Sequence, residues 1–199
     1  MQSKFVMSFL RSNPGIQRNG YTSKLLCIGL LLQGLTGCSD NNTKLPGVGQ
    51  PFPLSALKQL ENVRGEKVDF SNKTLLINFW ATWCTPCRSE MPDLQRLTDS
   101  LDPERFAIIG ISVDDDINLV REFLLQHKIR FPIFQDADLR LAADLLGIET
   151  YPDTFIVSPQ GTITKRINGI IRWDQNNIER IFESSNLNNP LISNHAMNG

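Results

Sequence analysis

The stretch Asn78–Pro92 reads NFWATWCTPCRSEMP. It joins an apolar, β-rich run at 74–80 to a segment whose apolar residues recur at helical spacing. Two cysteines, Cys84 and Cys87, therefore fall where a buried strand ends and a helix begins. Thiols at this spacing could bind a metal, brace the fold or exchange electrons, and the rest of the chain narrows these alternatives.

The composition is that of an ordinary globular protein. The chain has 199 residues, 41% of them apolar and 21% charged, which is enough for one domain with a core and short for two. The net charge of −1 conceals an asymmetry, because the first 38 residues carry four basic side chains and no acidic one. The other 16 basic and 21 acidic residues give a net charge of −5. No basic stripe is left to indicate binding of nucleic acid.

The N-terminal segment has the features of an export signal. The apolar run Leu25–Leu35 has 11 residues, whereas a membrane span takes about 20, so it fits the apolar region of a secretory signal. Leu35–Cys38 (LTGC) resembles the lipobox of bacterial lipoproteins, which implies a signal peptide at 1–37 and lipidation of Cys38. An uncleaved signal anchor is the alternative. Ser39, where inner-membrane lipoproteins carry aspartate, favours the outer membrane in a Gram-negative host.

The cysteine count limits what the central pair can do. The four cysteines are Cys27, Cys38, Cys84 and Cys87. The first would leave with the signal and the second would carry lipid, so one close pair remains, and this is not a disulfide-stapled scaffold. Zinc usually takes four protein ligands, or three with a water, and the chain offers only His127 and His195 besides this pair. A Cu(I) site of two soft thiolates stays open.

Strands alternate with helices and end in a hairpin. We expect a polar tether at 38–50, one domain at 51–185 and a frayed tail at 186–199. The expected strands are 74–80, 106–113, 131–134, 154–157 and 162–167, the expected helices are 85–101, 139–146, 173–182 and one capped by 114–116, and 63–67 is a turn between two short strands. This order predicts an α/β fold in which helices flank a mixed sheet.

Two motifs carry a resemblance to a known family. NFWATWCTPCRSEMP and the later Tyr151–Phe155 (YPDTF) resemble the TlpA/ResA/CcmG branch of thioredoxin-fold proteins, in the AhpC/TSA–redoxin superfamily, over about 52–182. The resemblance implies a thioredoxin-like fold with an N-terminal strand extension and a central insertion. It also implies a cis bond before Pro152, where Trp83, Tyr151 and Pro152 bind an extended substrate peptide. Tyr151 and Asp153 depart from the commonest family pattern, which leaves substrate preference open.

The position of the cysteines assigns their roles. Cys84 faces the unpaired N–H groups of a helix start, which favour its thiolate and make it the expected nucleophile. Cys87 lies one turn along and can resolve the mixed disulfide. Glu90 matches the family's active-site glutamate, which would accept or supply the Cys87 proton; the alternative is a solvated carboxylate beside Arg88. Asn78 stands where cytosolic thioredoxins generally carry a buried aspartate.

Together these features predict an exported, lipid-anchored thiol–disulfide oxidoreductase without a cofactor. The resemblance implies that it reduces protein disulfides, for example in cytochrome c maturation or copper-site assembly. A membrane thiol-electron transporter of the DsbD/CcdA kind would recharge it. A copper-binding chaperone is the alternative, and an oxidase is disfavoured because Thr85–Pro86 replaces the histidine common between oxidase cysteines. The aspartates at 114–116 would form either a solvated helix cap or the rim of the site.

Overall fold

The computed structural model describes residues 45–174, 177–178 and 180–181, which belong to one compact unit, Asn42–Gly199. The predicted signal peptide (1–37), the lipidation site Cys38, most of the tether and the tail (186–199) lie outside these residues. Across the described ranges, no helix combines the length and the apolar character needed to cross a membrane.

Ten helices and strands make up the described part of the chain. In order they are α1 (Leu54–Leu57), β1 (Glu61–Asn62), β2 (Thr74–Trp80), α2 (Thr85–Ser100), β3 (Phe106–Ser112), α3 (Ile117–Gln126), β4 (Ile133–Gln135), the π-helix η1 (Arg140–Leu145), β5 (Asp153–Val157) and β6 (Ile163–Asn168).

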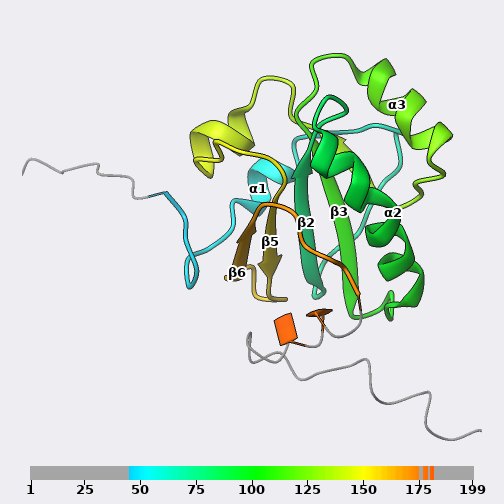
Figure 1. Cartoon of the computed structure of the whole chain (residues 1–199). Helices are drawn as coiled ribbons and strands as arrows, with labels where there is room; N and C mark the ends of the chain where they lie inside the picture. Colours follow the sequence, from blue (N-terminus) through cyan, green and yellow to red (C-terminus); the bar gives the residue numbers. More distant parts are fainter. Residues whose placement is uncertain (1–44, 175–176, 179, 182–199) are drawn as a thin grey trace, which may run out of the picture. The chain divides into compact units, whose positions relative to one another are not determined.

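The six strands form one mixed sheet in the order β1-β4-β3-β2-β5-β6. β2 pairs with β3, and β3 with β4, in parallel, whereas β1, β5 and β6 pair with their neighbours in antiparallel fashion. Every residue of β2 is buried, as expected for a central strand covered on both faces. Figure 1 shows β2 and β3 at the centre of the sheet, with α2 and α3 to their right. The predicted fold class, a mixed sheet flanked by helices, is confirmed.

The elements around the two cysteines agree closely with the sequence pattern. The strand expected at 74–80 is β2, and the helix expected at 85–101 is α2, which contains Pro92 and ends one residue earlier. The expected hairpin is β5 and β6, joined by a turn in which the Gly161 N–H donates to the Ser158 carbonyl at 2.8 Å. Gly161 has φ +82°, a backbone conformation that glycine adopts without steric cost. The expected final helix (173–182) lies partly outside the described residues.

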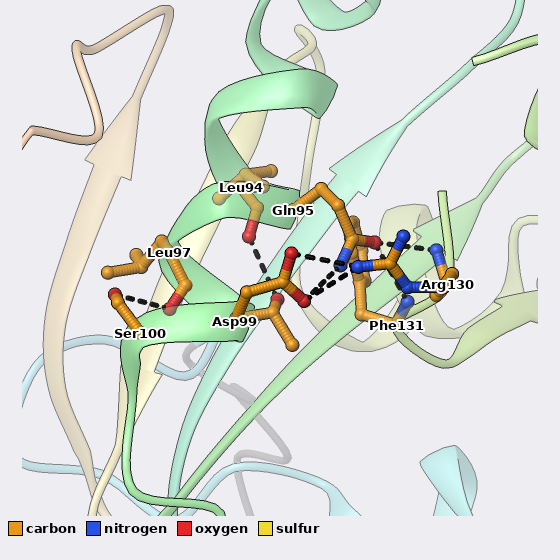
Figure 2. A network of polar contacts seen from close by, with 8 residues as sticks. Leu94, Gln95, Leu97, Asp99, Ser100, Arg130 and Phe131 are labelled. Carbon is orange, nitrogen blue, oxygen red and sulfur yellow. Dashed lines mark hydrogen bonds and ion pairs between the residues drawn. The ribbon is translucent and has the colours of Figure 1, made fainter. Parts of the chain in front are cut away.

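The strand predicted at 131–134 begins two residues later, as β4. Pro132 has no N–H to give to a sheet, and the N–H groups of Arg130 and Phe131 donate instead to the side-chain oxygen of Gln95, at 2.6 and 3.3 Å. Figure 2 shows this network, in which Asp99 accepts from both Gln95 and Arg130. It ties the second half of α2 to the chain entering β4.

One local prediction needs correction, and one expected helix is confirmed with an unusual geometry. The segment 63–67 is a turn after the single strand β1, without a second strand, because the Asn62 side-chain oxygen accepts the N–H groups of Arg64 and Glu66. The helix expected at 139–146 is the π-helix η1. The carboxylate of buried Asp136 accepts the N–H groups at the start of this helix, and Leu139 before it is left-handed, with φ 58°.

Candidate active site

A disulfide joins Cys84 and Cys87 at the start of α2. The sulfurs lie 2.00 Å apart, Cys84 is 6% exposed, and Cys87 is completely buried. Cys84 is the N-cap of α2, and its sulfur accepts the Cys87 backbone N–H at 3.3 Å. The helix N-terminus therefore directs N–H groups at the more accessible sulfur. After reduction, this arrangement favours a thiolate on Cys84.

Glu90 lies two turns into α2 and is buried, with 2% of its surface exposed. Its carboxylate accepts hydrogen bonds from the Asn78 amide at 2.8 Å and from the Trp173 indole at 3.1 Å. The solvated carboxylate beside Arg88 is therefore the wrong interpretation. Burial raises the pKa of Glu90 from 4.5 to about 7, although the hydrogen bonds from Asn78, Trp173 and the Ile171 backbone oppose that rise. Such a carboxyl group can both take and give a proton near neutral pH.

Asn78 connects Glu90 to the centre of the sheet. It lies on β2 opposite Thr154 of β5, and its amide nitrogen donates to Thr154 Oγ1 at 3.0 Å as well as to Glu90. Its own oxygen is buried and has no hydrogen-bond partner among the described residues. The titratable group of this buried site is thus Glu90 on the helix, while the β2 position carries a neutral amide.

Trp83 and Tyr151 lie on the exposed side of the disulfide. The Tyr151–Pro152 peptide bond is cis, the isomer that the resemblance implied. The Trp83 side chain is 65% exposed, and its ring meets Tyr151 edge to face, with centroids 5.9 Å apart. Trp83 is therefore accessible and Tyr151 is half-buried, whereas Pro152 is buried; a substrate surface at these three residues stays a prediction.

Asp153 anchors the loop behind Pro152, and sequence reasoning gave it no structural role. It is completely buried and accepts from the Arg166 guanidinium through two nitrogens, at 3.0 and 2.6 Å. Asn168 donates to the same carboxylate at 3.3 Å and contacts Thr150 on the other side of the proline. These contacts fix both ends of the Pro152 loop to β6.

The three aspartates at 114–116 do not form one patch. Asp114 is buried and accepts the backbone N–H and hydroxyl of Thr82 and the hydroxyl of Ser112. Asp116 alone is the side-chain cap of α3, accepting from the Asn118 N–H at 2.8 Å. For Asp114, both predicted roles are therefore wrong: it neither forms the rim of the site nor caps a helix in solvent. It holds the loop that leads into Cys84, a contact between residues 32 positions apart that no local signal in the sequence announces.

Metal-ligating side chains do not gather elsewhere in the described ranges, which contain no group of three or more His, Cys, Asp or Glu placed to hold an ion. His127 stacks on Phe123 with ring centroids 4.2 Å apart. His195 lies outside the described residues.

The sheet, the disulfide at a helix start and the adjoining cis-proline loop define a thioredoxin-like thiol–disulfide oxidoreductase. The family model described as AhpC/TSA matches residues 48–166, more than half of the chain, so the chain belongs to the AhpC/TSA family. This confirms the resemblance at the level of the superfamily.

Similar proteins are named as thiol-disulfide oxidoreductases or as thioredoxin-like proteins. Thiol-disulfide oxidoreductase ResA of Oceanobacillus iheyensis is 29% identical over 155 residues, covering 76% of this chain and 80% of the relative. The thioredoxin-like protein YneN of Bacillus subtilis is 33% identical over 142 residues, covering 67% and 82%. A solved structure of a thiol-disulfide oxidoreductase from Bacteroides fragilis is 29% identical, with a TM-score of 0.52, covering 61% of this chain and 94% of that one.

Proposed function

We propose that the protein is a reductant of protein disulfides, held outside the cytoplasm by a lipid on Cys38. In this proposal the signal peptide is 1–37, the tether 38–50, the thioredoxin-like domain 51–185 and the tail 186–199. The observation that supports a dithiol–disulfide cycle is the buried Glu90, whose pKa of about 7 suits it to move the second proton near neutral pH. The direction, reduction of the substrate, follows from the family resemblance and from the absence of a histidine between the two cysteines.

The chemistry follows from the two sulfurs and this carboxyl group. The Cys84 thiolate attacks one sulfur of a substrate disulfide, forms a mixed disulfide and releases a substrate thiolate. Glu90 then accepts the Cys87 proton, and the Cys87 thiolate attacks Cys84. The second substrate thiolate leaves, and the Cys84–Cys87 disulfide is restored. Two electrons pass to the substrate, so a membrane dithiol of the DsbD/CcdA kind has to supply two more.

The substrate surface is proposed to be Trp83, Tyr151 and Pro152. The exposed indole of Trp83 directly precedes Cys84, the more accessible cysteine, and meets the half-buried ring of Tyr151 edge to face, which supports docking of an extended peptide with apolar side chains. Apocytochrome cysteines and the cysteines of copper-site proteins are candidate substrates that such a surface accommodates.

The midpoint potential of the Cys84–Cys87 pair tests the direction of the reaction. A soluble form that begins at Ser39 would be equilibrated with defined thiol buffers, and we expect a value of roughly −270 to −230 mV, at the thioredoxin end of the scale. A value near −120 mV, typical of strong oxidants, would refute the reductant role. A Cu(I) titration of the reduced protein tests the alternative, and sub-nanomolar binding without disulfide turnover would favour the chaperone.

Lipidation is tested separately. Radiolabelled palmitate should enter the full-length protein, and Cys38→Ala should abolish the labelling. Labelling that persists in this variant would refute the anchor without bearing on the redox reaction.

A further inference from the structure

Trp173 contacts Glu90 from the chain that follows β6, 83 residues further along the sequence. Its ring is 5% exposed, and its indole N–H donates to the Glu90 carboxylate at 3.1 Å. The Ile171 backbone also lowers the pKa of this carboxyl group. The described side chains that donate hydrogen bonds to Glu90 are thus Asn78 from β2 and Trp173 from the segment after β6.

The structure around Trp173 holds the indole in place. The Asp174 carboxylate accepts the Asn177 N–H, and its backbone carbonyl accepts the Ile178 N–H, both at 3.0 Å. Ile178 and Ile181 are buried at 0% and 3% exposure. These contacts fix the backbone directly after Trp173, and the indole itself is buried and bonded to Glu90.

Trp173 acts on Glu90 in two opposite ways. Its N–H stabilises the ionised carboxylate and lowers the pKa, whereas its ring excludes water, and burial raises the pKa. From α2, Asp93 adds a repulsion that also raises it, and the two cysteines become titratable neighbours when reduced. The groups facing Glu90 from β2 and β5 are Asn78 and Thr154, which are neutral.

We propose that Trp173 is a positioning residue for the thiol–disulfide cycle: its indole holds the Glu90 carboxylate beside the cysteines and controls the pH at which Glu90 exchanges its proton. This inference rests on the proposed role of Glu90. When the Cys84–Cys87 bond is reduced, an electron pair enters and the Cys87 sulfur takes a proton from Glu90, leaving a carboxylate that the indole stabilises. In the reverse half-cycle Glu90 takes that proton back.

Two substitutions separate the two effects of the indole. Trp173→Phe keeps a ring but removes the donor, which binds the carboxylate more strongly than the neutral acid, so the pKa of Glu90 should rise by about one unit. Trp173→Ala removes the donor and also admits water, so the pKa should fall below that of the native protein. The titration would follow the carboxyl signal in the oxidised full-length protein, identified by its absence in Glu90→Gln.

Trp83→Phe is the matched control, because it changes an exposed indole on the substrate side and should leave the pKa of Glu90 where it was. Shifts of opposite sign in Trp173→Phe and Trp173→Ala support the inference. Shifts of the same sign, or none, overturn it. If Trp173→Ala does not fold by circular dichroism, Trp173→Phe decides alone: an upward shift supports the inference, and an unchanged pKa overturns it.

The kinetics distinguish this inference from the proposed function. The rate at which the reduced protein reduces a model disulfide should have a pH inflection that moves upward by about one unit in Trp173→Phe. In a Glu90→Gln background the Trp173 substitution should have no further effect. If Glu90→Gln keeps the native inflection, the role of Glu90 is refuted and the inference with it. If Glu90→Gln removes the inflection but Trp173→Phe does not move it, the inference alone fails.

Discussion

Replacing Glu90 by glutamine should change how the stability of the oxidised protein depends on pH. Glu90 is 2% exposed, and its pKa is raised from 4.5 to about 7, chiefly by burial. The folded protein therefore holds this proton more tightly than the unfolded chain between these two pH values. The stability contributed by protonated Glu90 is fully present below pH 4.5 and is lost as pH rises to about 7.

The size of the loss follows from the size of the shift. At 1.36 kcal/mol per pKa unit, ionising Glu90 in its buried site costs about 3 kcal/mol above pH 7. Glutamine stays neutral at every pH, so the Glu90→Gln variant does not lose this part of its unfolding free energy as the pH rises. Its amide N–H groups face the donors Asn78 and Trp173, which adds an offset that does not depend on pH. The pH-dependent part of the difference is therefore the quantity to measure.

Urea unfolding of the oxidised native protein and of Glu90→Gln, from pH 4.5 to pH 8, gives this difference by linear extrapolation. We expect the variant to gain about 3 kcal/mol relative to the native protein across that range. Buried Asp136, whose pKa is also raised by burial, is present in both proteins, so its contribution cancels. Glu122→Gln, on the exposed face of α3, is the control and should run parallel to the native curve. Parallel curves for Glu90→Gln would refute the buried, proton-holding site.

Two further substitutions test the contacts that hold the loops beside the disulfide. Arg166→Met leaves the carboxylate of Asp153 buried without its cation, so the unfolding free energy should fall by about 3 kcal/mol. Adding Asp153→Asn to Arg166→Met should restore most of the lost unfolding free energy. A double variant that is no more stable than Arg166→Met alone would contradict the ion-pair explanation. Asp114→Ala removes the acceptor for the Thr82 N–H and hydroxyl, and chemical unfolding should show a loss of about 3 kcal/mol. Asp114→Asn keeps one acceptor and should lose less; equal losses would show that packing, and not hydrogen bonding, matters there.

The sequence predicted the parts of the fold that depend on neighbouring residues. β2 is a continuous apolar run, and α2 begins at Cys84 with Pro86 in its first turn, so both have local signals at their ends. β4 begins later than expected because a side chain from a distant part of the chain, Gln95 of α2, accepts the backbone N–H groups that precede it. No local pattern encodes such a contact.

The same distinction applies to the site. The cysteines and Glu90 belong to one motif: the spacing and helix position indicated the roles of the cysteines, and the family resemblance implied the role of Glu90. The contact between Trp173 and Glu90 joins residues 83 positions apart, and it forms because β6 returns the chain to the start of α2. Asp114 looked like its neighbour Asp116, and only the packing of β3 against the Thr82 loop separates a buried acceptor from a solvated cap.

The two sides of the disulfide therefore have different physical characters, and this difference suits a cycle with two distinct half-reactions. The side with Cys84 is bordered by the exposed indole of Trp83, so a substrate sulfur can approach it from solvent. The side with Cys87 is closed, and in the proposed cycle its proton passes to Glu90, a buried carboxyl group held by neutral donors. Under this proposal, electron transfer takes place at the accessible cysteine and proton transfer at the buried one. A change on the substrate face should alter which proteins are reduced, whereas a change at Glu90 or Trp173 should alter the pH at which any of them is reduced.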